Sequence, residues 1–303
     1  MRKILLTGKN GQVGWELRRT LAPLGDVVAV GHQEMDLADP DSIRRTIREV
    51  RPHLIVNSAA YTAVDKAESE PDLAMTINGV APGIMAEEAK RLNAAIIHYS
   101  TDYVFDGAKK TPYSEEDIPN PLNVYGQTKL AGERAIQAAS VPYLILRASW
   151  VYGTRGRNFL LTILKLAKER SELEIVDDQV GAPTWSRMLA EVTSQIVAQL
   201  FSPQRGSAIP ISDVRGIYHA VPTGSTSWHG FAAKILEGAP RQTMLAPPKL
   251  TPIPTSDYPL PATRPQNSCL SSEKLMRTYG LAIPSWEESL ALCLQEITGA
   301  SAT

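Results

Sequence analysis

The sequence is poor in cysteine: it has two, Cys269 and Cys293, and they form no CxxC pair. This argues against a disulfide-stabilised scaffold and is typical of proteins from a reducing compartment. The five histidines are also spread along the chain without the spacing of metal ligands. We interpret them as packing or surface residues, so they predict no metal site.

The chain also has little excess charge and no long apolar run. Its 31 Lys and Arg stand against 32 Asp and Glu, a net charge of −1, and the basic stripe of a nucleic-acid-binding protein is missing. No stretch approaches the roughly 20 apolar residues of a membrane helix. The apolar run after residues 1–3 is interrupted at Thr7, too early for a signal peptide. We expect a cytoplasmic protein that binds neither nucleic acid nor membranes.

Short apolar runs rich in β-branched residues alternate with amphipathic segments in the first half of the chain. The runs KILLT, VVAV, LIVN, AIIHYS and YLILR have the length and composition of strands buried on both faces. Asp39 is typical of a helix N-cap and Pro40 of a first helical residue, whereas Pro82 must lie in a first turn or kink its helix. The alternation predicts an α/β fold with a doubly wound, Rossmann-type parallel sheet and right-handed crossovers.

A glycine-rich turn directly follows the first expected strand and opens a helix. The stretch LLTGKNGQVGWEL places Gly8, Gly11 and Gly14 there, with the spacing G-x-x-G-x-x-G. In a dinucleotide site such glycines make the tight turn, let the backbone approach the pyrophosphate, and let the helix pack closely on the strand. The N–H groups and the dipole of the helix N-terminus then face the phosphates. The readable strand and helix favour a cofactor site over an ordinary turn.

The end of the second expected strand carries Gly31 and His32, where an acid would select NAD over NADP. With no carboxylate at these two positions NADPH is not excluded, yet no arginine stands ready to hold its extra phosphate. Asp36 and Leu37 follow in a later turn and are expected near the adenine. The sequence therefore predicts NADPH or NADH as the cofactor and leaves the preference open.

The composition of the chain changes after Trp150. Proline-rich stretches such as APPKLTPIPTSDYPLPATRP mark a loop-dominated lobe. We expect a dinucleotide-binding domain at residues 1–150 and a smaller α/β domain, mainly for the substrate, at residues 151–303. Segments near residues 172–200 and 214–222 are expected to return to the first domain.

Tyr125 and Lys129 stand four residues apart in the helical pattern VYGQTKLAGERAI and therefore share one helix face. A nearby ammonium favours the phenolate, so we expect Lys129 to lower the pKa of Tyr125 toward neutrality. A tyrosine tuned in this way can donate a proton to a carbonyl oxygen. The preceding strand ends in Ser100 and Thr101, whose hydroxyls can hydrogen-bond the same oxygen, at the edge where such sheets bind ligands.

Together these motifs resemble the extended short-chain dehydrogenase/reductase family. Further stretches are similar, more narrowly and over nearly the whole chain, to the dTDP-4-dehydrorhamnose reductases within it: VNSAAYTAVDKAESEP, HYSTDYVFDG, PLNVYGQTKLAGE, RASWVYG, DDQVGAPT and RPQNSCL. The resemblance implies reduction of the C4 keto group of dTDP-4-dehydro-L-rhamnose by NADPH or NADH. That reaction is the last step of dTDP-L-rhamnose synthesis for cell-surface polysaccharides.

The same resemblance implies roles for individual residues. Tyr125 is expected to be the general acid, Lys129 to bind the nicotinamide ribose, and Thr101 to orient the C4 carbonyl. The residues expected to contact the cofactor are Gly8, Gly11, Gln12, Val13, Gly14, Asp36, Leu37, Ala59, Ala60, Tyr61, Tyr125 and Lys129. The residues expected to contact the dTDP-sugar substrate are Thr101, Asp102, Trp150, Arg264 and Asn267.

Some relatives are dimers bridged by a divalent cation through glutamates. Glu16 and Glu296 match two of those acids, but Arg187 stands where another is expected. No metal is therefore predicted, while a homodimer stays an expectation.

Two other functions fit the same family. A sugar-nucleotide dehydratase needs Asp followed by Glu after the threonine, and here Asp102 is followed by Tyr103. An epimerase shares the Tyr–Lys chemistry and is harder to separate by sequence. A non-enzymatic alternative is a dinucleotide-binding regulatory subunit, like the homologues that regulate methionine adenosyltransferase. The intact Thr101, Tyr125 and Lys129 favour catalysis over this alternative.

Overall fold

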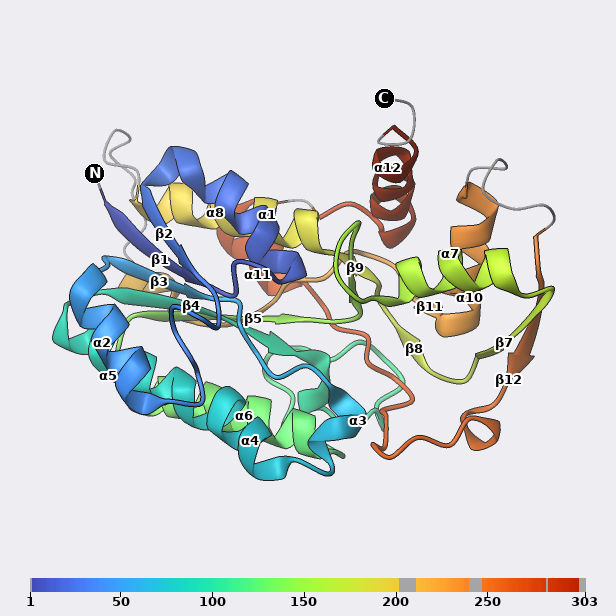
Figure 1. Ribbon diagram of the computed structural model, residues 1–303, viewed down its shortest axis with the longest axis horizontal. Coiled ribbons are helices and arrows are strands. Elements are labelled where there is room, and N and C mark those ends of the chain that lie inside the picture. The colour runs from blue at the N-terminus through green and yellow to red at the C-terminus, as the bar shows by residue number, and fades with distance from the viewer. Residues whose placement is uncertain (1, 202–210, 240–246, 282, 300–303) are drawn as a thin grey trace.

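The chain is described by a computed structural model, which places residues 2–201, 211–239, 247–281 and 283–299. Its centre is a six-stranded sheet in which every pairing is parallel, with helices on both faces (Figure 1). In spatial order the strands are β10 (Gly216–His219), β5 (Tyr143–Ala148), β4 (Ala95–Thr101), β3 (Leu54–Asn57), β1 (Lys3–Thr7) and β2 (Asp26–Val30). The predicted doubly wound α/β fold is confirmed.

The strand order reverses between β1 and β3, which are neighbours in the sheet although β2 separates them along the chain. The chain leaves β1 toward one edge of the sheet and later continues from β3 toward the other. Loops that follow the two strands therefore diverge and leave a crevice at their carboxyl ends. Ligands bind at such a switch point in open α/β sheets.

Two layers of helices cover the sheet. One face carries α1 (Gln12–Leu21), α8 (Ser186–Phe201) and α11 (Glu273–Tyr279), and the other carries α2 (Pro40–Val50), α5 (Ala81–Arg91) and α6 (Val124–Ala138) (Figure 1). Each layer buries its own apolar cluster against the strands. Because the strands are covered on both sides, they read as continuous apolar runs in the sequence.

Local signals explain where several helices begin. The Asp39 carboxylate caps α2 by accepting a hydrogen bond from the Asp41 N–H at 2.9 Å, with Pro40 as the first helical residue, as predicted. The helical segment that connects β3 to β4 runs from α4 (Pro71–Met75) through a π-helical turn, Thr76–Val80, into α5. Pro82 lies in the first turn of α5, where its missing N–H is tolerated because the π turn rearranges the ladder just before it.

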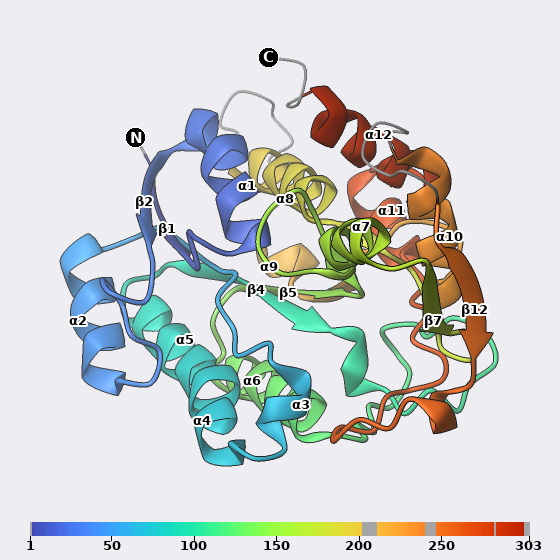
Figure 2. The same cartoon turned by 45° about the vertical axis from the view of Figure 1, so that its right-hand side comes forward.

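A smaller lobe lies beside the carboxyl ends of the strands (Figures 1 and 2). Its core is an aromatic-rich cluster between three helices, α7 (Phe159–Glu169), α10 (Trp228–Gly238) and α12 (Trp286–Gly299). The lobe also contains a two-stranded parallel sheet of β7 (Glu172–Val176) and β12 (Lys249–Ile253). Besides three 3₁₀ turns, Ala22–Leu24, Asp102–Val104 and Thr255–Asp257, the described residues form the short elements α3 (Val64–Ala67), α9 (Ile211–Val214), β6 (Val151–Tyr152), β8 (Val180–Gly181), β9 (Thr184–Trp185) and β11 (Thr226–Ser227).

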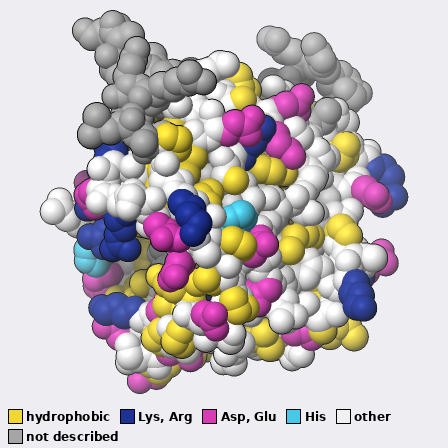
Figure 3. Space-filling model, turned by 90° about the vertical axis from the view of Figure 1, so that its right-hand side faces the viewer, with side chains coloured by type: hydrophobic (Ala, Val, Ile, Leu, Met, Phe, Trp, Pro, Cys, Tyr) yellow, Lys and Arg dark blue, Asp and Glu magenta, His cyan; other side chains and the backbone are white. Residues whose placement is uncertain are grey.

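Segments from the second half of the chain cross back to the main sheet. β10 pairs with β5 at its edge, and α8 packs against α1. Within the segment 172–200, however, β7 pairs with β12 in the lobe instead of approaching the main sheet. On the outer face of the lobe acidic and basic side chains are interspersed (Figure 3). Among the helices that the structure describes, none has both the length and the apolar character needed to cross a membrane.

Candidate active site

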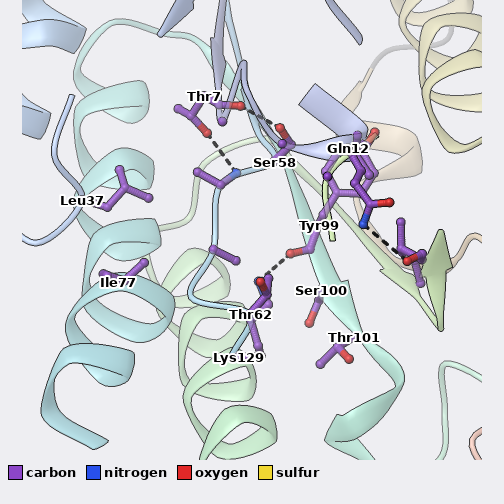
Figure 4. A pocket seen from close by; sticks show the side chains of 18 of the residues that line it. Thr7, Gln12, Leu37, Ser58, Thr62, Ile77, Tyr99, Ser100, Thr101 and Lys129 are labelled. Atoms are coloured by element: carbon purple, nitrogen blue, oxygen red, sulfur yellow. Dashed lines mark hydrogen bonds between the residues drawn. The ribbon is translucent and has the colours of Figure 1, made fainter. Parts of the chain in front are cut away.

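A cavity of about 780 Å³ extends along the carboxyl ends of β1, β2, β3 and β4 (Figure 4). It is bounded by the glycine loop on one side, the start of α6 below, and the lobe at its far end. This volume lies in the range of ordinary ligand and cofactor sites. It coincides with the switch point of the sheet, so the fold and the cavity indicate the same place for a ligand.

The glycine loop is built for close approach. Gly8 has a φ of +72°, and a Cβ on it would lie 3.0 Å from the Ala59 backbone nitrogen. A Cβ on Gly14 would lie 2.0 Å from the Gly8 carbonyl oxygen, so α1 can pack this tightly only with glycine there. Gly11 ends the turn by donating its N–H to the Gly8 carbonyl, and α1 begins at Gln12. The loop thus fits a dinucleotide pyrophosphate, with helix N–H groups at the cavity wall.

Most residues predicted to contact the cofactor line this cavity. They are Gly8, Gly11, Gln12, Val13, Asp36, Leu37, Ala59, Ala60, Tyr125 and Lys129. Two do not line it. Gly14 is buried behind the loop, where it fixes the helix. The Tyr61 hydroxyl donates to the Glu70 carboxylate at 2.7 Å and its N–H donates to the Asn78 side chain, so this residue shapes the loop after β3.

The start of α6 is placed by a backbone contact. The Asn123 side chain caps the helix by accepting from the Gly126 N–H at 2.8 Å. A Cβ on Gly126 would lie 2.1 Å from the Tyr103 carbonyl oxygen, in the turn after β4. Glycine at this position therefore lets α6 dock directly on that turn. The docking brings Tyr125, in the first turn of α6, beside Thr101 at the end of β4.

Tyr125 is fully protonated at neutral pH. Burial raises the pKa of its phenol to about 12, the Thr101 hydroxyl partly offsets this rise, and the Asp102 carboxylate adds to it. The prediction that Lys129 lowers this pKa toward neutrality is wrong, because the pKa of the phenol is raised and Lys129 is not among the groups that shift it. The spacing of four residues fixes a shared helix face, but it does not determine which group the ammonium contacts.

Lys129 is turned toward β4 instead of Tyr125. Its ammonium donates to the Tyr99 carbonyl oxygen at 2.6 Å (Figure 4). The ammonium also lies 3.2 Å from His98 Nε2. Burial lowers the pKa of Lys129 to about 8, and the Glu133 carboxylate opposes that shift. Burial also holds the pKa of His98 well below its usual value, so His98 is a neutral neighbour.

The end of β4 carries buried polar atoms, some of which have no hydrogen-bond partner among the described residues. The Thr101 hydroxyl donates to Asp102 Oδ1 at 2.9 Å. Asp102 Oδ2 and the Ser100 hydroxyl are buried without a hydrogen-bond partner among the residues that the structure describes. Burial raises the pKa of Asp102 to about 7. Because an unpaired buried polar atom costs free energy, these atoms indicate where a polar ligand binds.

Trp150 forms the wall between the cavity and the lobe. Its backbone has a φ of +46°, an unusual conformation for a large residue, and its indole stacks on that of Trp228 with ring centroids 3.5 Å apart. A Cβ on Gly181 would lie 2.6 Å from Cε2 of the Trp150 ring, so the indole also packs closely on the Gly181 backbone. The contacts with Trp228 and Gly181 fix the indole as a flat apolar surface.

A second cavity, also of about 780 Å³, lies within the lobe and shares Trp228 with the first. Arg264 lines it and forms a two-pronged ion pair with Asp65, at 2.8 and 3.0 Å. Asn267 lines neither cavity. Its amide donates to the Lys109 and Thr111 carbonyls, and its Oδ1 accepts from Cys269, so it ties the loop 109–111 to the end of the lobe.

Arg157 also lines the first cavity, and the sequence did not single it out. Within the described part of the chain its guanidinium has neither a hydrogen bond nor an ion pair. Its loop is tied to the phosphate turn, because the Asn158 amide donates to Gln12 Oε1 at 2.9 Å. The only signal in the sequence is the basic stretch GTRGRN that follows β6. This basic stretch indicates a ligand-binding residue only once the structure shows that its loop lies next to Gln12.

The acids considered for a metal form an ion-pair cluster. Arg187 contacts Glu16 at 3.2 Å and Glu296 at 2.6 Å, and Arg19 contacts Glu16 at 3.4 Å. The guanidinium of Arg187 thus stands between the two carboxylates. Throughout the described residues, no three His, Cys, Asp or Glu side chains gather as metal ligands would.

The cavity lies at the switch point of a parallel sheet and is lined by Thr101, Tyr125 and Lys129, an arrangement that fits the extended short-chain dehydrogenase/reductases. The chain is a member of that class. UDP-glucose 4-epimerase of Thermus thermophilus, solved with NAD, matches the fold with a TM-score of 0.79 at 20% identity, over 98% of this chain and 99% of that one. At this identity the likeness concerns the fold alone.

The family follows from closer matches. A family model described as "RmlD substrate binding domain" matches residues 1–298. The dTDP-4-dehydrorhamnose reductase of Burkholderia thailandensis is 46% identical over 298 residues, covering 97% of this chain and 99% of the relative. The crystal structure of the Bacillus anthracis enzyme of that name, in complex with NADP, has a TM-score of 0.87 at 34% identity, covering 97% of this chain and 99% of that one. The chain belongs to the RmlD family of dTDP-4-dehydrorhamnose reductases.

Proposed function

We propose that the protein is a dTDP-4-dehydrorhamnose reductase. It reduces the C4 keto group of dTDP-4-dehydro-L-rhamnose with NADPH or NADH and yields dTDP-L-rhamnose. The observation that carries the proposal is the placement of Tyr125 and Thr101 at one end of the cavity whose other end is the glycine loop. A proton donor and a hydride donor can then meet at one carbonyl group.

The reduced nicotinamide, when bound, supplies the hydride to C4. Tyr125 is the general acid, and its high pKa keeps the proton on the phenol until the carbonyl oxygen gains negative charge. Thr101 orients the same oxygen, which requires its hydroxyl to turn away from Asp102. Lys129 is cationic at neutral pH, and in the loaded enzyme it binds the nicotinamide ribose and favours the phenolate that Tyr125 leaves behind.

The sugar nucleotide is proposed to span both cavities. Asp102 Oδ2 accepts from, or donates to, a sugar hydroxyl and so loses its unpaired state. Trp150 provides the flat surface beside the sugar. Arg264, whose charge is paired with Asp65, lines the second cavity, where the nucleotide portion is proposed to lie. The dinucleotide-binding unit is accordingly proposed to be residues 1–150 with two later segments that pack on it, α8 and the stretch near 214–222. The rest of residues 151–303, including β7 at the start of the segment 172–200, is proposed mainly to hold the substrate.

The alternative of a dehydratase is not supported by the geometry. Residue 103 is a tyrosine whose ring meets that of Tyr125 edge-on, at 5.8 Å and 79°. The second carboxylate that a dehydratase requires at this position is therefore replaced by a partly buried aromatic ring.

The test follows nicotinamide absorbance with dTDP-4-dehydro-L-rhamnose, using NADH and NADPH in turn. A cofactor deuterated at the transferred position should leave deuterium at C4 of the product. Oxidation of neither cofactor would refute the reductase assignment, and epimerisation without net oxidation would identify an epimerase.

The pH dependence of kcat/KM should show the titration of Asp102. Its pKa of about 7 leaves it neutral below and anionic above this pH, and the anion raises the pKa of Tyr125. We expect kcat/KM for reduction to fall as the pH rises through 7, by up to about ten-fold per pH unit. In Asp102→Asn this inflection should vanish, while thermal unfolding checks that the variant is folded. An unchanged inflection in the variant assigns it to another group, such as Lys129.

The cytoplasm and a homodimer are proposed as the cellular setting. Both cysteines are free and buried, which fits the cytoplasm as the working compartment. A homodimer is proposed from the family resemblance, and sedimentation at working concentrations tests it. A monomer under all conditions would contradict it.

A further inference from the structure

An ion pair lies at the end of β2, where the adenosine ribose of the cofactor is expected to bind. Gly31 directly follows β2 and lines the cavity, and neither it nor His32 is acidic. However, the Glu34 carboxylate folds back and accepts from the Gly31 N–H at 2.8 Å. A carboxylate therefore does stand at the end of β2, supplied from three residues further along the chain.

Lys9 neutralises this carboxylate. It lies in the glycine loop, and its ammonium donates to Glu34 Oε1 at 2.6 Å. That hydrogen bond and the one from Gly31 hold the pKa of Glu34 below its usual value, so the carboxylate is ionised. Both side chains are partly exposed, at 25% for Lys9 and 47% for Glu34, and can therefore move.

Lys9 and Glu34 both lie next to residue 31, the position where an acid was expected. A Cβ on Gly31 would lie 3.3 Å from Glu34 Oε2, 3.4 Å from Lys9 Cε and 3.1 Å from Asn10 Nδ2. Glycine at residue 31 thus leaves room for both charged groups at the rim. An acid alone at this place repels a 2′-phosphate, and a cation alone attracts it. The ion pair presents both signs at one position.

We propose that Lys9 and Glu34 together determine how the protein selects between NADPH and NADH. Glu34 accepts a hydrogen bond from the ribose 2′-hydroxyl of NADH. Lys9 leaves Glu34 and pairs with the 2′-phosphate of NADPH. The inference deepens the proposed function and rests on it for kinetic measurements, whereas nucleotide binding tests it independently.

The experiment compares Glu34→Gln and Lys9→Met with the unaltered protein. The kcat/KM ratio of NADPH to NADH should rise about ten-fold in Glu34→Gln and fall about ten-fold in Lys9→Met, because each variant leaves one charge unopposed beside the phosphate. Calorimetric titration with 2′,5′-ADP and 5′-AMP should show the same two opposite shifts in affinity ratio. The shift in Lys9→Met should shrink at high salt, since the groups are exposed.

Lys234→Met is the matched control, because it breaks an exposed ion pair with Glu237 on α10 in the lobe. Its cofactor ratio should be unchanged. Ratios within two-fold of the unaltered protein in both test variants, or shifts in the same direction, would overturn the proposal. If no dTDP-sugar is reduced at all, the two nucleotide probes still decide the question.

Discussion

Replacing Tyr125 by phenylalanine is expected to lower kcat by about 10²- to 10⁴-fold, the contribution typical of a positioned general acid. The phenol is the proposed proton donor beside Thr101, and its removal takes the positioned acid away from the oxygen formed at C4. The loss corresponds to about 3–5 kcal/mol of transition-state stabilisation. Because the ring remains, the KM for both substrates should change little. Initial-rate kinetics with saturating cofactor measure the effect.

Tyr152→Phe is the matched control for this substitution. The Tyr152 hydroxyl is buried and has no hydrogen-bond partner among the described residues, and the residue lines neither cavity. Its loss should leave kcat unchanged and should not lower the free energy of unfolding. A Tyr125→Phe variant that retains the full rate would show that another group donates the proton.

Replacing Glu133 by glutamine is expected to lower the free energy of unfolding by about 3–5 kcal/mol. Glu133 on α6 and Arg147 on β5 form a two-pronged ion pair, at 2.7 and 2.9 Å, and both side chains are 1% exposed. Without the carboxylate, the arginine remains as a buried cation between helix and sheet. The face of Phe105, 5.1 Å away, offsets only a small part of that cost. Urea unfolding measures the change.

Glu88→Gln provides the comparison within the same chain. Glu88 on α5 is also buried and binds Arg48 through two hydrogen bonds, but the Arg48 side chain is 53% exposed. Water can solvate that arginine when its partner is lost, so the cost should be about 1 kcal/mol or less. Equal losses in the two variants would show that the exposure of the remaining cation does not decide the cost.

The elements of the nucleotide-binding half were predictable because their signals are local. Apolar runs covered on both faces gave the strands, and Asp39 with Pro40 gave the start of α2. The glycine loop was predictable for a different reason: Gly8 and Gly14 satisfy steric demands that only a turn between strand and helix makes. In each case the cause lies within a few residues of the element it determines.

Features that depend on tertiary neighbours could not be predicted in the same way. The orientation of Lys129 is set by the Tyr99 carbonyl on β4, which helical spacing does not specify. The carboxylate at the end of β2 was missed because Glu34 reaches Gly31 through a turn. The acid therefore stands three residues later in the sequence than expected, although it lies at the expected place in the structure. Asn267 was assigned to the substrate, yet its amide is consumed by two backbone carbonyls.

The contact between Gly126 and the Tyr103 carbonyl has a consequence for how the protein can change over time. The alignment of the proton donor with the end of β4 is determined by main-chain packing, where a single methyl group would force α6 outward. The side chains proposed to meet the sugar and the nucleotide are Trp150, at the boundary with the lobe, and Trp228 and Arg264 within the lobe. Substitutions in the lobe can therefore change the substrate preference during evolution, while the position of the proton donor stays the same.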